Sequence, residues 1–224
     1  MPERITLAPD DPRYPPRLLD VSSDLPAYRV DGDAGILARR DLVAVCGARR
    51  CTPYGMLCAQ ETGRTVADTG MILLAGGAVG TQTAAVEAAL ERGGQCVVML
   101  GSGLDQPYPA RNVELFRRVV DAGGAIVSPY PDDMPPLPVH FRARNDLIVR
   151  ASLCLVVVEA GLPSGTYSMV DSATELARPV LAWPGQVSSP QSAGSNAAIA
   201  MGTASCLDSA DMLAERPHLI RDNA

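Results

Sequence analysis

Residues 42–55 read LVAVCGARRCTPYG, and the fold is decided by this stretch. Its first part, Leu42–Cys46, is apolar on both faces, which is typical of a strand buried inside a parallel sheet. Gly47 then opens a turn. Thr52 suits the N-cap of a helix and Pro53 suits its first position, so we expect a helix to begin there. The stretch therefore predicts one strand–loop–helix unit.

The same unit recurs along the chain. Apolar runs bounded by glycine or proline predict buried strands at Leu42–Cys46, Met71–Ala75, Cys96–Leu100, Ala125–Ser128, Leu153–Val158 and Val180–Trp183. Helical patterns lie between them, at Pro53–Ala67, Thr83–Arg92, Pro109–Ala122, Val139–Ala151 and Thr166–Ala177. Repeated strand–helix–strand units predict an α/β fold: a Rossmann-like, doubly wound, mostly parallel sheet with helices on both faces.

The two ends of the chain are less regular. Residues 1–38 are rich in proline and aspartate, and we expect them to form an N-terminal extension that packs on a core domain, residues 39–224. The segment Pro129–Pro138 is predicted to be a surface loop. After Asp208 the sequence predicts one short helix and then a frayed end.

The charge balance argues against non-specific coating of DNA. The 224 residues carry a formal net charge of −6, whereas a dedicated nucleic-acid binder usually presents a basic face. A local basic pocket can still exist within an acidic chain. All 19 basic residues are arginine. This is explained either by genomic composition or by a need for planar cations that match phosphate groups, and both explanations stay open.

Metal, cofactor and membrane sites are not indicated. The six cysteines form no C-x-x-C pair, and the chain has two histidines, so we expect no metal and no cofactor. The opening residues Met1–Arg4 lead into no apolar segment, and no apolar run approaches the length of a membrane span. We therefore expect a cytoplasmic protein without a signal peptide.

Four predicted strands end in glycine-containing loops. Ligands of open parallel sheets bind at the carboxyl ends of the strands, where glycine lets backbone approach a ligand and helix N-termini attract anions. Turn geometry alone explains a single loop of this kind. Four at one edge predict a shared phosphate-binding crevice. Their spacing does not match the G-x-G-x-x-G dinucleotide motif. The loop residues are Gly47; Gly76, Gly77 and Gly80; Gly101 and Gly103; and Ser164, Gly165 and Thr166.

Several motifs resemble those of the DNA-processing protein A (DprA/Smf) family. Residues 47–55 resemble its G-x-R-x-x-T-x-Y-G motif, and residues 101–112 its G-x-G-L-D-x-x-Y-P-x-x-N motif, the most specific of the set. Residues 141–145 resemble its F-x-x-R-N segment. The resemblance spans roughly residues 10–207, and it implies an extended Rossmann fold, a single-stranded DNA pocket, a homodimer and loading of the recombinase RecA. It implies no enzymatic activity. From the length of the sequence we expect neither the N-terminal helical domain nor the C-terminal winged helix that the family often carries.

The resemblance and the loops together nominate the binding residues. Phosphate contacts are expected from Arg49, Arg50, Arg142, Arg144 and Asn145, with backbone N–H groups of the glycine loops as further donors. Asp105 and Glu159 are candidates for ribose or base contacts, or they cap loops and pair with arginines. Tyr54, Tyr108 and Phe141 are candidates for base stacking or for packing.

The chain departs from the family at four ionisable positions. The family pattern S-G-x-A-R-G-I-D followed by A-H has neutral residues here, with Val79, Gln82 and Val86 at the Arg, Asp and His positions. The family's R-N-R reads Arg144-Asn145-Asp146. We expect the loss of positive charge to weaken electrostatic affinity for DNA, or to adapt the pocket to a smaller ligand.

Two other functions stay open. One is a nucleotide-sensing module of the same superfamily, with a mononucleotide across the loops. The other, less favoured, is a nucleoside-monophosphate phosphoribohydrolase. Those enzymes use a P-G-G-x-G-T-x-x-E motif, but Met169 stands at the position of the glutamate. No triad-like arrangement surrounds His140 or His218 either, so we nominate no catalytic residue.

Overall fold

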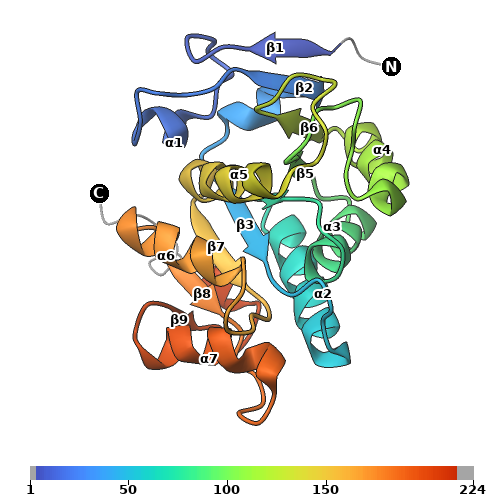
Figure 1. Ribbon diagram of the computed structural model, residues 1–224. Helices are drawn as coiled ribbons and strands as arrows, with labels where there is room; N and C mark the ends of the chain where they lie inside the picture. Colours follow the sequence, from blue (N-terminus) through green and yellow to red (C-terminus); the bar gives the residue numbers. More distant parts are fainter. Residues whose placement is uncertain (1–3, 216–224) are drawn as a thin grey trace.

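The computed structural model describes residues 4–215 and contains one nine-stranded sheet (Figure 1). The strand order is β1-β2-β6-β5-β4-β3-β7-β8-β9. All neighbouring pairs are parallel except β1 with β2 and β2 with β6. The strands are β1 Ile5–Leu7, β2 Tyr28–Gly32, β3 Leu42–Cys46, β4 Ile72–Ala75, β5 Cys96–Met99, β6 Ala125–Ser128, β7 Cys154–Val157, β8 Val180–Ala182 and β9 Ser205–Cys206. The predicted fold class is confirmed, and each of the six predicted strands is present.

Helices cover both faces of the sheet. The helices are α1 Pro16–Leu19, α2 Pro53–Asp68, α3 Thr81–Glu91, α4 Val113–Asp121, α5 Pro138–Ala151, α6 Tyr167–Glu175, α7 Ala193–Ala200 and α8 Met212–Glu215, with short 3-10 turns at Ala34–Ala38, Ala110–Asn112 and Pro190–Ser192. One apolar core contains side chains of α2, α3, α4 and α8, and the other contains side chains of α1, α5, α6 and α7. In β3, Val43 and Val45 face the first core, whereas Ala44 and Cys46 face the second. The central strands β3, β4, β5 and β7 are buried on both faces because helices cover each face.

The N-terminal stretch contributes two strands that the sequence did not suggest. β2 pairs antiparallel with β6, with Arg29 opposite Ser128, and β1 pairs antiparallel with β2. Tyr14 and Tyr28 are almost fully buried and their ring centroids lie 5.5 Å apart. The first part of the chain is thus joined to the sheet by backbone hydrogen bonds. The division into units at residue 38 stays a prediction.

The C-terminal stretch differs from expectation in a similar way. Helix α7 and strand β9 were not predicted, because their residues lack a clear helical or alternating pattern. The short helix expected after Asp208 is present as α8. The frayed end predicted beyond it lies outside the described residues.

The sheet changes direction at β3. From β3 the chain passes through α2 to β4 on one side, while β7 lies on the other side of β3. Such a switch point leaves a crevice at the carboxyl ends of the strands, where ligands of this fold class bind. Gly63 allows close packing of α2 on α3, since a Cβ at this position would lie 2.1 Å from the Ala85 carbonyl oxygen. The fold therefore brings the loops after β3, β4 and β7 to one place.

Candidate nucleic-acid interface

A hollow of about 360 Å³ opens at this switch point, and we call it the cleft. Loops after β3, β4 and β7 supply most of its wall, and α5 and α6 close it. Eight predicted site residues line it: Gly47, Arg49, Arg50, Arg144, Asn145, Ser164, Gly165 and Thr166. Cys46, Ala48, Ala78, Gln82, Phe141 and Met169 complete the lining. The sequence expectation that separate loops converge on one crevice is confirmed for the loops after β3 and β7.

Arg144 is a buried cation in the wall of the cleft. It lies on α5 with 4% of its surface exposed, and its Nη1 donates to the carbonyl oxygens of Gly76, over 2.5 Å, and Met99. No carboxylate lies within ion-pair distance of it in the described part of the chain, and its Nε has no acceptor. Burial, and then the charge of Arg49, lower the pKa of Arg144 to about 10, so it stays protonated at neutral pH. A buried charge without a counter-charge is costly, and an anion would relieve that cost.

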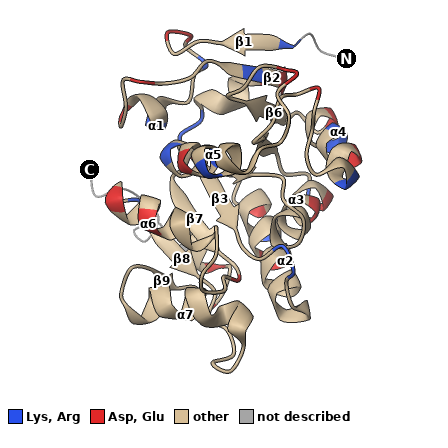
Figure 2. Cartoon of the chain, viewed as in Figure 1, with Lys and Arg blue, Asp and Glu red and all other residues tan. Residues whose placement is uncertain are grey.

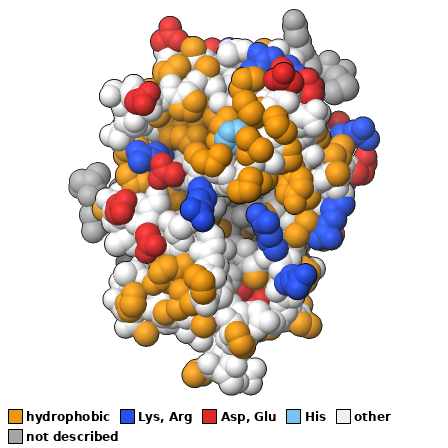
Figure 3. Space-filling model, viewed as in Figure 1, with side chains coloured by type: hydrophobic (Ala, Val, Ile, Leu, Met, Phe, Trp, Pro, Cys, Tyr) orange, Lys and Arg blue, Asp and Glu red, His pale blue; other side chains and the backbone are white. Residues whose placement is uncertain are grey.

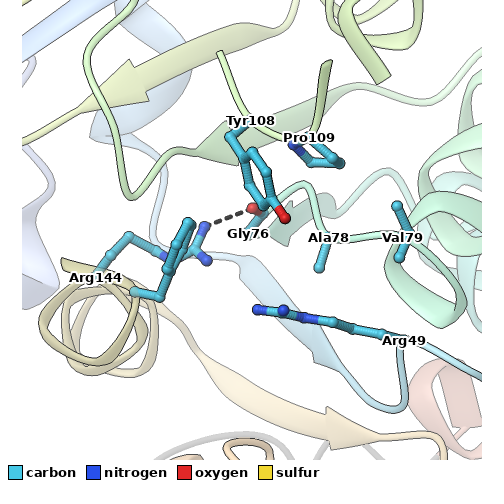
Figure 4. A pocket seen from close by; sticks show the side chains of 8 residues that line it. Arg49, Gly76, Ala78, Val79, Tyr108, Pro109 and Arg144 are labelled. Carbon is cyan, nitrogen blue, oxygen red and sulfur yellow. Dashed lines mark hydrogen bonds between the residues drawn. The ribbon is translucent and has the colours of Figure 1, made fainter. Parts of the chain in front are cut away.

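Aromatic rings flank a smaller hollow of about 40 Å³ beside Arg144 (Figure 4). The Tyr108 and Phe141 ring centroids are 5.5 Å apart. The guanidinium carbons of Arg49 and Arg144 each lie 5.9 Å from the centre of the Phe141 ring. In Figure 4, Arg49 and Arg144 approach each other from opposite sides, with Tyr108 above them. Guanidinium groups and aromatic faces stand together, as they do in grooves that bind single strands.

Many arginines have a carboxylate partner, but those that line the cleft do not. Nine pair with a carboxylate: Arg4, Arg13, Arg29, Arg39, Arg40, Arg64, Arg92, Arg117 and Arg150. Within residues 4–215, no such partner is found for Arg49, Arg50 and Arg144, which line the cleft. No aspartate or glutamate is among the described residues that line it. Figure 3 shows arginine side chains on both sides of a recess near the middle of one face. The acidic chain thus keeps positive charge at the switch point.

The loop after β4 is closed by Gln82. Its Oε1 accepts the N–H groups of Gly76 and Ala78, both over 3.0 Å. These two amides therefore have an acceptor, which differs from the expectation that the loop offers its N–H groups to a ligand. From the sequence, Gln82 is only a neutral residue at the family's Asp position. Its amide oxygen accepts hydrogen bonds as an aspartate oxygen does, and this was the available signal.

The other glycines of the predicted loops after β4 and β5 pack against neighbouring parts of the protein or bond to them. Gly77 has a φ of +71° and packs against Phe116, and Gly101 packs against Phe141. Gly103 donates its N–H to the Met134 carbonyl over 2.8 Å. Gly80 has a φ of +85°, and a Cβ there would lie 2.4 Å from the Ala48 carbonyl oxygen. Gly80 therefore lets the start of α3 lie against the loop after β3.

Asp105 and Glu159 lie outside the lining of the cleft. Asp105 pairs with Arg4 over 2.5 Å. Glu159 is 1% exposed, and its two oxygens accept from the backbone N–H and hydroxyl of Thr52, which itself caps α2 through the Gly55 N–H. Asp105 thus pairs with an arginine and Glu159 holds the capping residue Thr52, which are the alternatives to ribose or base contact given above. Tyr54, also weighed for stacking, donates its hydroxyl to the Pro184 carbonyl.

The remaining candidates lie on helix α5 and in the turn before α6. Arg142 is exposed and is not among the residues that line the cleft or the smaller hollow. Asp146 pairs with Arg150 over 2.6 Å and accepts the Ser172 hydroxyl, so its carboxylate is directed to α6 rather than into the cleft. The Ser164 hydroxyl accepts the Tyr167 N–H, and the Thr166 hydroxyl donates to the Gly47 carbonyl. These two bonds fasten the loops after β3 and β7 to each other and to α6.

Comparison with known proteins identifies the family. The family model for DNA recombination-mediator protein A matches residues 5–217. The chain belongs to the DNA recombination-mediator protein A family. Protein Smf of Escherichia coli (strain K12) is 35% identical over 201 residues, which is 90% of this chain and 54% of Smf. The chain thus spans about half the length of this curated relative. The resemblance to the DprA/Smf family is confirmed.

Solved structures of family members have the same fold. DNA processing protein A from Streptococcus pneumoniae matches with a TM-score of 0.86 and 30% identity, over 96% of this chain and 75% of that one. The protein from Helicobacter pylori, whose single-stranded DNA binding mode was studied, matches with a TM-score of 0.84 and 25% identity, over 96% of this chain and 95% of that one. No helix in residues 4–215 is long and apolar enough to cross a membrane. Within the same residues, no group of three or more His, Cys, Asp or Glu side chains is arranged to hold a metal ion.

Proposed function

We propose that this protein binds single-stranded DNA in the cleft and acts without catalysis in DNA uptake and recombination, in the cytoplasm, by loading RecA. The observation that carries the proposal is Arg144: a buried, protonated guanidinium in a cleft whose described lining contains no carboxylate. A phosphodiester supplies the missing negative charge and matches the planar donor set of arginine. The Helicobacter pylori relative, whose strand binding was studied, supports this choice of ligand.

The dimensions of the site favour a single strand over a duplex. The cleft, at about 360 Å³, is as large as a small-molecule pocket, which suits one or two nucleotides. Tyr108 is 43% exposed and lies beside Phe141, so unstacked bases can rest on these rings. Bases in a duplex are already stacked on each other and would not be available to them.

The absence of catalysis is supported by Met169. This residue lines the cleft and stands where the related phosphoribohydrolases have their glutamate. A thioether transfers no proton, so the glycosidic reaction lacks its acid. We therefore propose that the ligand leaves the cleft unchanged.

A homodimer is part of the proposal, and the C-terminal surface supports it. Residues 179–207 contain no Asp, Glu, Lys or Arg, and Figure 2 shows α7 without a charged side chain. Met201 is 63% exposed on this surface. Uncharged surfaces with exposed apolar side chains favour association with another protein. RecA is the partner that the family resemblance implies.

Fluorescence polarisation with labelled oligo-dT at several salt concentrations tests strand binding. We expect affinity that falls steeply with salt, because phosphate contacts release counterions. Arg144→Ala and Arg49→Ala should weaken binding strongly, whereas Arg118→Ala, which removes an exposed arginine outside the cleft, should leave it nearly unchanged. The proposal is wrong if oligo-dT does not bind at low salt.

A mononucleotide ligand is the second candidate, favoured by the same cleft volume. Thermal stabilisation by nucleoside monophosphates, without binding of oligo-dT, would support a sensing module instead. Release of free base from a nucleoside monophosphate would support the hydrolase.

A further inference from the structure

A second hollow, of about 380 Å³, lies on the other side of the loop after β3. The first turns of α2 and α3, the loop itself and the 3-10 turn before α4 enclose it. Its lining consists of Arg49, Arg50, Cys51, Met56, Gly80, Thr83, Ala84, Glu87 and Arg111. We call it the second hollow.

The cleft and the second hollow share a boundary. Arg49 and Arg50 line both of them, so the two arginines form the ridge between the hollows. Both side chains are exposed, and neither pairs with a carboxylate in the described part of the chain. A ligand that leaves the cleft over this ridge enters the second hollow without leaving the positive surface.

The second hollow carries a net positive charge of its own. Arg49, Arg50 and Arg111 contribute three positive charges and Glu87 contributes one negative charge. Nine other arginines have carboxylate partners, yet none of the three forms an ion pair with Glu87, although it lines the same hollow. The guanidinium groups are therefore available to a phosphate.

The walls of the second hollow suit the rest of a nucleotide. Met56 is 37% exposed and Cys51 is partly exposed, so both offer apolar surface to a sugar or base. Glu87 repels phosphate groups on the α3 side. Its charge favours a path in which the backbone of the strand lies toward Arg50 and Arg111.

We propose that the second hollow is a further phosphate subsite for the same strand. The strand passes from the cleft over Arg49 and Arg50, and Arg50 and Arg111 hold a second phosphate beyond the ridge. This inference rests on the proposed function. It adds that the protein binds an oligonucleotide at two separate phosphate-binding subsites. A ligand confined to the cleft does not contact Arg111, so Arg111 does not contribute to its affinity.

The test is a length series. Binding of oligo-dT from a dinucleotide to a dodecamer is measured at several salt concentrations for the wild type, Arg111→Ala and Arg118→Ala. Arg118 lies one helix further on, is exposed, and lines neither hollow, so it controls for the loss of one charge. Glu87→Gln removes the negative charge from the second hollow, so its expected effect on affinity is opposite to that of Arg111→Ala.

The expected result is a difference that depends on strand length. For long strands, Arg111→Ala should lower affinity several-fold and reduce the slope of log K against log salt by about 0.7, the value for one phosphate contact of a single strand. For the shortest strands, Arg111→Ala should behave as the wild type. Glu87→Gln should raise affinity for the long strands alone.

Other outcomes overturn specific parts. If the wild type binds strands with the expected salt dependence, but Arg111→Ala equals Arg118→Ala at every length, the second subsite is wrong and the cleft proposal stands. An equal loss for short and long strands also contradicts the subsite, because it assigns Arg111 to the cleft. Failure of the wild type to bind any strand would overturn the proposed function itself.

Discussion

Gly76 and Arg144 fit together only because Gly76 has no side chain. The carbonyl oxygen of Gly76 accepts from Nη1 of Arg144, and a Cβ on Gly76 would lie 2.4 Å from that nitrogen. The glycine at the end of β4 therefore creates the space that the buried guanidinium occupies. In this family member the role of Gly76 is to seat a cation, while its own N–H is held by Gln82.

Gly76→Ala should abolish strand binding while the fold persists. The clash involves the far end of a long side chain, so the guanidinium can move aside at small cost to stability. Polarisation titrations and thermal melts would be compared with Gly161→Ala, where a new Cβ would lie 3.4 Å from its nearest neighbour, an ordinary contact. Unchanged affinity in Gly76→Ala would show that the position of Arg144 does not matter for binding.

Tyr108→Ala should weaken binding without changing its salt dependence. Stacking of a base on an aromatic ring contributes about 1–3 kcal/mol and releases no counterion. Because Tyr108 is 43% exposed, the thermal stability should change little. The measurement is affinity for oligo-dT at several salt concentrations. A reduced salt slope would mean that Tyr108 acts by positioning an arginine rather than by stacking.

Glu159→Gln should lower stability and leave strand affinity unchanged. The substitution replaces one acceptor by a donor that faces the N–H or hydroxyl of Thr52, and an unsatisfied buried group costs about 1–3 kcal/mol. Chemical denaturation measures the first effect and polarisation the second. A large loss of affinity in a variant that remains well folded would instead support contact of Glu159 with the ligand.

Two substitutions toward the family pattern should have different effects. Val79 lines the smaller hollow beside Arg49, so Val79→Arg adds a cation near the strand and should raise both affinity and salt slope. Asp146 is directed to α6, where it pairs with Arg150, so Asp146→Arg should add little affinity and should destabilise that contact. Equal gains from both variants, measured with the same oligo-dT, would contradict these placements.

The charge changes at Val79 and Gln82 also offset each other. Relative to the family pattern, Val79 removes one positive charge and Gln82 removes one negative charge, so the formal charge of these two positions is unchanged. Gln82 still accepts both loop amides. Together with the outward direction of Asp146, this weakens the sequence-based expectation that the cleft has lost much of its electrostatic attraction.

The parallel part of the sheet could be predicted because its information is local. Strands such as β3 and β7 are continuous apolar runs, and glycine or proline marks their ends. Strand β2 could not be predicted, since residues 28–32 read YRVDG and their pairing depends on β6, far away in the sequence. The convergence of loops followed from the fold class. The loop closure by Gln82 and the pairing of Asp105 with Arg4 depend on side-chain contacts that no local pattern specifies.

The positive charge that lines the cleft and the second hollow resides entirely on guanidinium groups, because the chain contains no lysine. Acetyltransferases modify amines, so they have no side chain here on which to cancel that charge. For the experimenter, amine-reactive footprinting reagents will not label this surface, whereas dicarbonyl reagents selective for arginine will report its occupancy.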